Sequence, residues 1–244
     1  MRILKLGPGT LPIPPVGWGG IEKIVWQLAV QLRSFGHEVD IFNTADVRAL
    51  AAHLACHQYD VIHAYTDWPL DYLAGCGRRW AFTSNQSEWT YNRRVFDLGY
   101  SRCDIAICVN EMVYDALPHH RNKFIVHNAA CPDIYKPLPK IPGKCVALGR
   151  NEPRKRFKEV AALFTGGLKG RLRSALGLPA MAADCHLLII GPGAECFRHE
   201  GLVDVLPNSS DEVVSQHLGE AEYFFHLSHY EAEALAVHEA SMSG

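Results

Sequence analysis

The stretch that decides the fold is Tyr223-Phe-Phe-His-Leu227 followed by Ser228-His-Tyr-Glu231-Ala-Glu-Ala-Leu-Ala-Val-His-Glu239-Ala-Ser-Met-Ser-Gly244. Its first five residues are an apolar run that predicts a buried strand. From about Ala234 onward, good helix formers predict a helix. Glu231 is therefore expected in the turn before that helix, and Glu239 inside it.

The start of this helix suggests a phosphate site. Unpaired backbone N–H groups and the positive end of the helix dipole favour an anion there. Two carboxylates beside such a site would repel the phosphate, but they can accept hydrogen bonds from hydroxyl groups attached to it. A ribose and a sugar provide such hydroxyls, so the pattern favours a nucleotide-sugar. The alternative is a strand followed by an ordinary surface helix that carries two solvated glutamates.

The same stretch resembles the motif S-x-x-E-x-F-G-L-x-x-x-E-A-M-A-x-G of retaining family-4 glycosyltransferases, which have the GT-B fold. Glu231, Leu235 and Glu239 match the motif. Glu233 stands where the family usually has Phe, and Ala234 stands where it has the Gly that lets backbone approach the diphosphate. The resemblance implies that Glu231 contacts the transferred sugar and Glu239 the ribose, with Ala234 and Leu235 near the phosphates.

The N-terminal segment supports this resemblance. A Gly- and Pro-rich loop ends at Gly19 and Gly20, and apolar residues at helical spacing predict a helix from Ile21 to Phe35. Bare backbone at Gly19 and Gly20 can approach an anion closely. The string G-G-I-E through G-H-E-V resembles the first strand–loop–helix unit of the family. A nicotinamide cofactor is disfavoured, because Pro12 follows Gly7 and Gly9, and Cys196 follows Gly191 and Gly193, where the Rossmann fingerprint has its third glycine.

Strand and helix patterns alternate along the rest of the chain, which predicts an α/β protein with parallel sheets. Strands are expected at Ile3–Leu6, Glu38–Phe42, Val61–Tyr65, Trp80–Ser84, Ile105–Val109, Phe124–His127, Cys145–Leu148, Leu187–Ile190 and Asp204–Leu206. Ligands in such sheets bind at the carboxyl ends of the strands. His63 is expected there, with a satisfied structural histidine as the alternative. Family members place a sugar-contacting histidine at the end of the next strand, where Gln86 is the best match and Asn85 a second choice.

The resemblance implies two Rossmann-like domains that face a cleft. The segment from Asn128 to Pro137 resembles the family's exit from the first domain, and the Pro-rich stretch that follows suggests a boundary. We therefore expect an acceptor-side domain at 1–140 and a nucleotide-sugar domain at 141–244. Acceptor contacts are expected from aromatic residues of the first domain: Trp18, Tyr65, Trp68 and Trp89.

A basic turn follows the first strand of the second half. Gly149, Arg150 and Lys155 resemble the family's G-R-x-x-x-x-K-G, which implies that Arg150 and Lys155 contact the donor diphosphate. Gly191 and Gly193 resemble the family's L-x-I-V-G-x-G. Cations are needed where no metal neutralises the leaving diphosphate, and the sequence contains no D-x-D triplet. We expect no metal and no other cofactor, and a solvated basic turn is the alternative.

Composition sets broad limits. The net charge of −2 gives no electrostatic case for nucleic acid or an anionic membrane. No apolar run is long enough to span a bilayer, and no signal peptide is recognisable at the N-terminus. The eight cysteines contain no C-x-x-C pair, which favours free thiols. These features predict a cytoplasmic protein.

The chain stops where family members continue with further strand–helix units. A shortened second domain, a fragment and a chain completed by a partner are all compatible with this, and an exposed sheet edge would favour a homo-oligomer. The sequence predicts a retaining, metal-independent glycosyltransferase that uses a UDP- or GDP-type sugar donor and an acceptor hydroxyl. The alternatives are a non-catalytic nucleotide-sugar-binding remnant and another GT-B enzyme such as an epimerase.

Overall fold

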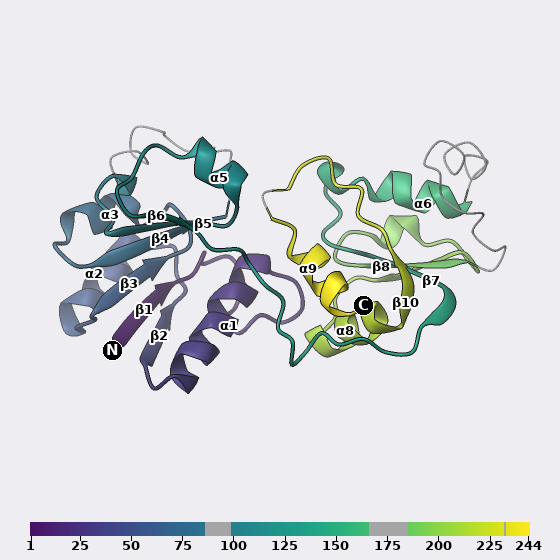
Figure 1. The fold of residues 1–244 in the computed structure, drawn as a ribbon, viewed down its shortest axis with the longest axis horizontal. Helices are drawn as coiled ribbons and strands as arrows, with labels where there is room; N and C mark the ends of the chain where they lie inside the picture. The colour runs from purple at the N-terminus through teal and green to yellow at the C-terminus, as the bar shows by residue number, and fades with distance from the viewer. Residues whose placement is uncertain (86–98, 166–184, 232) are drawn as a thin grey trace. The chain divides into compact units, whose positions relative to one another are not determined.

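The computed structural model describes residues 1–85, 99–165, 185–231 and 233–244. The chain divides into two compact units (Figure 1). The first unit comprises residues 1–15 and 19–128, and the second comprises residues 16–18 and 129–244. Each unit is described below by itself.

The first unit contains a parallel sheet, in which the described strands follow the order β2-β1-β3-β4-β5-β6. Its strands are β1 (Arg2–Leu6), β2 (Glu38–Phe42), β3 (Val61–Ala64), β4 (Trp80–Ser84), β5 (Ile105–Cys108) and β6 (Lys123–Ile125). The central strand β4 is buried along its whole length. Parallel pairing requires crossover connections, and described helices lie in the connections from β1 to β4 and from β5 to β6.

Helices cover this sheet. They are α1 (Gly20–Ser34), α2 (Val47–Cys56), α3 (Leu70–Gly75) and α5 (Glu111–Ala116). Side chains cap two of them: Asp46 accepts from the first turn of α2, and Asn110 accepts from Val113 in α5. The longest of these helices, α1, packs Ala29 against Ile3 and Val39 of the sheet. The apolar face that this helical spacing creates on α1 thus covers β1 and β2.

The second unit contains a parallel sheet whose described strands follow the order β10-β7-β8-β9. Its strands are β7 (Ile141–Leu148), β8 (His186–Ile190), β9 (Val203–Leu206) and β10 (Ala221–Phe224). Its helices are α6 (Phe157–Thr165), α8 (Asp211–Glu220) and α9 (Leu235–Met242), with short 3-10 helices at η1 (Pro153–Lys155) and η2 (Glu195–Phe197).

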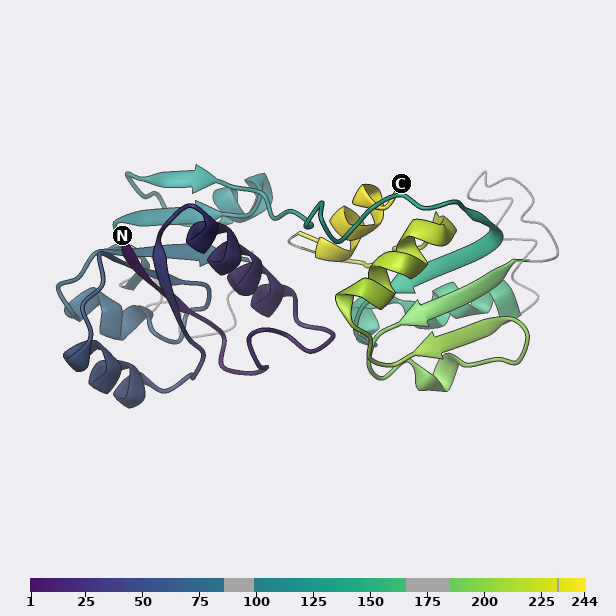
Figure 2. The same ribbon diagram turned by 90° about the horizontal axis from the view of Figure 1, so that it is seen from below.

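Alternate residues of these strands face two different apolar clusters. Cys145 and Leu187 pack with residues of α6 such as Phe157, whereas Val146 and Leu188 pack with residues of α8 that include Val214 and Leu218. Figure 2 shows the two helices on opposite sides of the sheet. The sheet is therefore buried on both faces, as expected for parallel strands in an α/β protein.

The predicted α/β class with parallel sheets is confirmed, and β2 and β4 have the predicted bounds. The prediction of a buried strand from Tyr223 to Leu227 is wrong in part. Strand β10 covers Ala221–Phe224, and Tyr223 is 41% exposed. Because β10 is the edge strand of its sheet, only β7 holds it in place on one side. In the described parts of the chain, no helix has the length and apolar character needed to cross a membrane.

Candidate functional site

The pairing of β10 with β7 places two loops side by side at the carboxyl edge of the second sheet. The last strand hydrogen bond joins the Phe225 N–H to the Val146 carbonyl at 2.8 Å. Beyond it, the His229 N–H donates to the Arg154 carbonyl at 2.8 Å, and the Arg154 guanidinium donates to the Tyr230 carbonyl at 3.3 Å. These hydrogen bonds hold the loop after β10 against the basic turn after β7.

Glu231 is the centre of a polar cluster between these loops. Its carboxylate accepts a hydrogen bond from the Lys155 ammonium, and it forms an ion pair with the Arg154 guanidinium at 2.7 Å. The Ser228 hydroxyl donates to the same carboxylate at 2.8 Å. We call Glu231, Lys155, Arg154 and Ser228 the Lys155 cluster. The sequence predicted Lys155 and Glu231, and the structure brings them together.

The Lys155 cluster is mostly shielded from solvent. The side chains of Lys155 and Glu231 are 11% and 18% exposed. Burial alone would raise the pKa of Glu231, but the hydrogen bond and the charge of Lys155, with help from Ser228 and Arg154, hold it below its ordinary value. Glu231 is therefore ionised at neutral pH, and it supplies an acceptor that the two cations already use.

Bare backbone borders the cluster. Gly149 and Gly191, at the ends of β7 and β8, have φ angles of 144° and 145°, which favour glycine. A Cβ at Gly191 would lie 1.9 Å from the Gly149 carbonyl oxygen, and one at Gly149 would lie 3.4 Å from Cε of Lys155. Glycine is thus required for the close approach of the two strand ends, and the Lys155 side chain runs beside the backbone of Gly149. Asn151 fixes the next turn by donating to the Gly193 carbonyl at 2.7 Å.

Arg150 lies apart from the Lys155 cluster in its described contacts. Its guanidinium forms an ion pair with Glu152 at 3.0 Å, and its side chain is 50% exposed. It also lies over the ring of Trp18, 5.0 Å from the ring centroid. Trp18 groups with the second unit by its contacts, although the sequence assigned it to the first domain. Arg154, which the sequence analysis did not select, takes the place beside Glu231. The only sequence signal for it was the run of three cations from Arg154 to Arg156.

Glu239 is buried rather than open to solvent. It is 3% exposed, and the Tyr135 hydroxyl donates to its carboxylate at 2.9 Å. Burial, followed by the charges of Glu239 and Asp211, raises the pKa of Tyr135. The phenol therefore stays protonated and remains a donor to the carboxylate. The sequence analysis missed Tyr135, which is 104 positions from Glu239 and outside the motif that selected this glutamate.

Two departures from the family motifs have different structural consequences: Ala234, and Arg156, which stands where G-R-x-x-x-x-K-G ends in glycine. Ala234, just before α9, has φ −84° and ψ 97°, an extended conformation that any residue can adopt. Replacing glycine by alanine therefore causes no backbone strain there. Arg156 has φ 55° and ψ 37°, a left-handed conformation that favours glycine. No side chain caps the start of α9 at Ala234–Leu235.

His63 belongs to the first unit, where it is held by other side chains. Its Nε2 lies 2.7 Å from the Thr83 hydroxyl, and its Nδ1 lies 3.1 Å from the Tyr65 hydroxyl. The buried Lys5 ammonium donates to the same Tyr65 hydroxyl. Burial, followed by the charge of Lys5, lowers the pKa of His63 well below its ordinary value, and burial lowers the pKa of Lys5 to about 8. His63 is therefore a neutral histidine that takes part in a polar chain.

The remaining predicted residues of the first unit lie at other strand and helix ends. Gly19 precedes α1, and Gly20 is its first residue. The carboxylate of Glu22 is buried near Gly19, and it accepts a hydrogen bond from the Thr10 hydroxyl at 3.1 Å. An acidic side chain thus already lies beside the helix start that was predicted to bind phosphate.

The residues at the end of β4 are only partly described. Gln86 and Trp89 lie outside the described residues. Asn85, the second choice for the sugar contact, has a buried Nδ2 that finds no hydrogen-bond partner in the part of the chain that the structure describes. Its oxygen accepts from Asn128 at 3.4 Å. Elsewhere, no group of three or more His, Cys, Asp or Glu side chains among the described residues is placed to hold a metal ion.

Comparisons with known proteins concern the fold. No family model matches the sequence, and no curated protein matches it. Among solved structures, the catalytic domain of Starch Synthase IV from Arabidopsis thaliana, bound to ADP and acarbose, matches with a TM-score of 0.69 and 12% identity, over 98% of this chain and 80% of that one. The chain has the GT-B fold. The predicted fold class is thereby confirmed.

Two further GT-B structures agree. The lipopolysaccharide outer core galactosyltransferase WaaB, in its apo form, matches with a TM-score of 0.55 and 14% identity, over 100% of this chain and 78% of that one. TarM from S. aureus, in a variant complexed with fondaparinux, alpha-GlcNAc-glycerol and UDP, matches with a TM-score of 0.60 and 14% identity, over 79% of this chain and 42% of that one. At these identities, the likeness establishes the GT-B fold of this chain.

Proposed function

We propose that the chain is a glycosyltransferase that moves a sugar from a UDP- or GDP-type sugar donor to an acceptor hydroxyl, with retention of the anomeric configuration and without a metal ion. The observation that carries this proposal is the Lys155 cluster beside the bare backbone of Gly149 and Gly191. It combines cations, a carboxylate and two glycines without side chains at the carboxyl ends of the strands of a parallel sheet, where ligands of such sheets bind.

The cations would serve the leaving diphosphate. Negative charge builds up on the diphosphate as the bond to the sugar breaks, and fixed cations stabilise that charge. Lys155 and Arg154 are already held at the site by Glu231, so little ordering is needed when a phosphate replaces the carboxylate as their partner. Arg150 is half-exposed and paired with Glu152, and it would turn from Glu152 to the diphosphate.

The carboxylates would serve the hydroxyl groups of the donor. In this role Glu231, released by Lys155, accepts from the transferred sugar, and Glu239 accepts from the ribose. An ionised carboxylate offers about four acceptor positions, so Glu239 can accept from a ribose hydroxyl as well as from Tyr135. The main chain at Gly193, Ala234 and Leu235 would approach the phosphates, with the positive end of the α9 dipole assisting.

The first unit would supply the acceptor side. Neutral His63 can exchange a hydrogen bond with a hydroxyl without adding charge, and Gln86 can do the same through its amide. Gly19 and Gly20 would shape the phosphate side. Retention and independence of metal are inferred from the resemblance to family-4 glycosyltransferases and from the sequence, which contains no D-x-D triplet.

Donor turnover tests the proposal. Purified chain is incubated with a panel of UDP- and GDP-sugars, and released nucleoside diphosphate is measured for the unchanged protein, for Lys155→Ala and for Lys158→Ala. Lys158 is the matched control, since it lies in α6 outside the cluster and is exposed. The proposal predicts release that Lys155→Ala abolishes and Lys158→Ala leaves intact. Equal release from all three proteins would remove the enzyme assignment.

A second candidate is a protein that binds a nucleotide-sugar without transferring the sugar. It is favoured by the partners that the predicted residues already have, because Lys155 is neutralised by Glu231 and Glu239 is held by Tyr135. This candidate predicts that a donor raises the melting temperature by binding the folded state, while no nucleoside diphosphate or epimerised sugar nucleotide is formed. Accumulation of either product would exclude it.

A further inference from the structure

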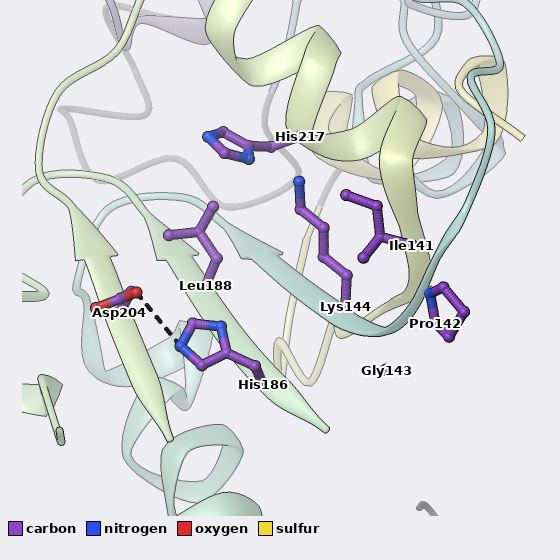
Figure 3. Close-up of a pocket in the computed structure, with 8 residues that line it drawn as sticks. All are labelled: Ile141, Pro142, Gly143, Lys144, His186, Leu188, Asp204 and His217. Carbon is purple, nitrogen blue, oxygen red and sulfur yellow. Dashed lines mark ion pairs between the residues drawn. The ribbon is translucent and has the colours of Figure 1, made fainter. Parts of the chain in front are cut away.

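A pocket lies in the second unit at the amino-terminal half of its sheet. Its volume is about 260 Å³. The lining comes from the start of β7 at Ile141–Lys144, from His186 and Leu188 of β8, from Asp204 of β9 and from His217 of α8. Figure 3 shows Leu188 between the His186–Asp204 pair and the nitrogens of Lys144 and His217. The pocket is therefore built from one face of the sheet and the helix that covers it.

The charges at this pocket are already paired. The Lys144 ammonium donates to the Glu220 carboxylate at 2.5 Å, with side chains 14% and 21% exposed. His186 lies 3.3 Å from the carboxylate of Asp204 at a more open position, with side chains 40% and 62% exposed. A charged ligand would have to compete with one of these partners, so the lining favours a ligand without net charge.

One buried polar atom at this pocket has no hydrogen-bond partner among the described residues. It is the Nδ1 atom of His217. Burial, followed by the charge of Lys144, lowers the pKa of His217, so the neutral imidazole is favoured. An unpaired buried nitrogen costs free energy, and a ligand group that donates to it or accepts from it would remove that cost.

The rest of the lining limits the size and polarity of a ligand. Ile141, Pro142 and Leu188 present apolar surface. The volume is slightly below the range of about 300–1,000 Å³ that is typical of sites for drug-sized molecules. We propose that this pocket binds a small uncharged molecule with an apolar body and one amide, carbonyl or hydroxyl group, which hydrogen-bonds to His217.

This site would be separate from the Lys155 cluster. The pocket residues His186 and Lys144 lie at the amino-terminal part of β8 and β7, whereas Gly149 and Gly191 follow the carboxyl ends of the same strands. Because the strands are parallel, the pocket lies toward their amino-terminal ends and the Lys155 cluster lies at their carboxyl ends. The proposal does not depend on the proposed glycosyl transfer, and a nucleoside diphosphate should leave this binding unchanged.

Three probes of the same size test the inference. Benzamide is uncharged, benzoate is an anion and benzylamine is a cation. Protein labelled with ¹⁵N-histidine is titrated with each probe, and the imidazole resonances are followed by NMR. We expect benzamide to shift the His217 nitrogens in a saturable way. The charged probes should bind about tenfold more weakly, because they would bury a charge without a partner.

Two variants and one direct contact complete the test. His217→Phe keeps an aromatic ring but removes Nδ1, and it should abolish benzamide binding. His199→Phe, at an exposed histidine outside the pocket, is the matched control and should not change it. NOEs from the benzamide ring to the methyl groups of Ile141 and Leu188 test the location in the unchanged protein, should the His217 variant fail to fold. Absence of any His217 shift with benzamide, or equal binding of benzamide and benzoate, would overturn the proposal.

Discussion

Replacing Lys155 with Met removes one of the two cations that contact Glu231. The Lys155–Glu231 pair is largely shielded, so it should contribute more than a surface ion pair, which is worth about 0–1 kcal/mol. A hydrogen bond to a charged group contributes about 1.5–3 kcal/mol. Arg154 stays 2.7 Å from the carboxylate and Ser228 still donates to it. We therefore expect Lys155→Met to lower the free energy of unfolding by about 1.5 kcal/mol, the lower end of that range.

A double-mutant cycle measures this interaction. Lys155→Met, Glu231→Gln and the double variant are unfolded in urea at pH 7, and the coupling free energy is calculated from the three differences. Arg150→Met is the control. Its ion pair with Glu152 is half-exposed, so this substitution should lower the free energy of unfolding by less than about 0.5 kcal/mol. A Lys155–Glu231 coupling below about 0.5 kcal/mol, or an equal cost for Arg150→Met, would refute the reasoning.

The pH dependence of the same cycle provides a second check. The pKa of Glu231 is lowered in the folded protein, so the unfolded chain binds more protons as the solution is acidified. The contribution of the pair is complete above the ordinary glutamate pKa of 4.5, and it is lost as the pH falls through the lower folded value. The coupling should therefore decline below pH 4.5. A coupling that stays constant under more acidic conditions would contradict the assignment of the charge to Glu231.

Three further predictions concern individual side chains. Tyr135→Phe leaves the buried Glu239 without its phenol donor and should lower the free energy of unfolding by about 1–3 kcal/mol, measured in urea; an unchanged value would contradict the hydrogen bond. Arg156→Gly removes the backbone strain of a non-glycine residue in the left-handed conformation, so it should raise the free energy of unfolding by about 1 kcal/mol and raise the melting temperature. A lower melting temperature would contradict this prediction. His63 should remain neutral at pH 6.5 in an NMR titration, and because its pKa is lowered on folding, stability should fall as the pH falls below 6.5; His63→Gln should weaken that dependence.

The fold was predictable where periodicity and placement agreed. The apolar spacing of α1 predicted its length, because one face of that helix is needed to cover β1 and β2. Strand β4 was predicted with its observed bounds because it begins with the apolar run Trp80-Ala-Phe82 and is buried along its whole length. Strand β10 was not, because an edge strand is held on one side only and its apolar sequence continues past its last ladder position.

The site was predictable where two positions follow adjacent strands. Lys155 and Glu231 come after β7 and β10, and pairing of those strands is enough to bring them together. The partner of Glu239 was not predictable, since Tyr135 reaches it through packing between distant segments. The pocket at Lys144 and His217 was not predictable either, because its lining comes from several elements and follows no sequence motif.

Binding of nucleotides to the Lys155 cluster tests the central claim most directly. Isothermal titration of UDP, GDP, UMP and GMP is carried out on the unchanged protein, on Lys155→Met and on the control Lys158→Met, which changes an exposed lysine of α6 outside the cluster. We expect one of the two diphosphates to bind at least about tenfold more tightly than its monophosphate, since the second phosphate would gain charge-assisted hydrogen bonds, and Lys155→Met to remove that difference. Equal affinities for diphosphate and monophosphate, or a preference for the diphosphate that survives in Lys155→Met, would contradict the account.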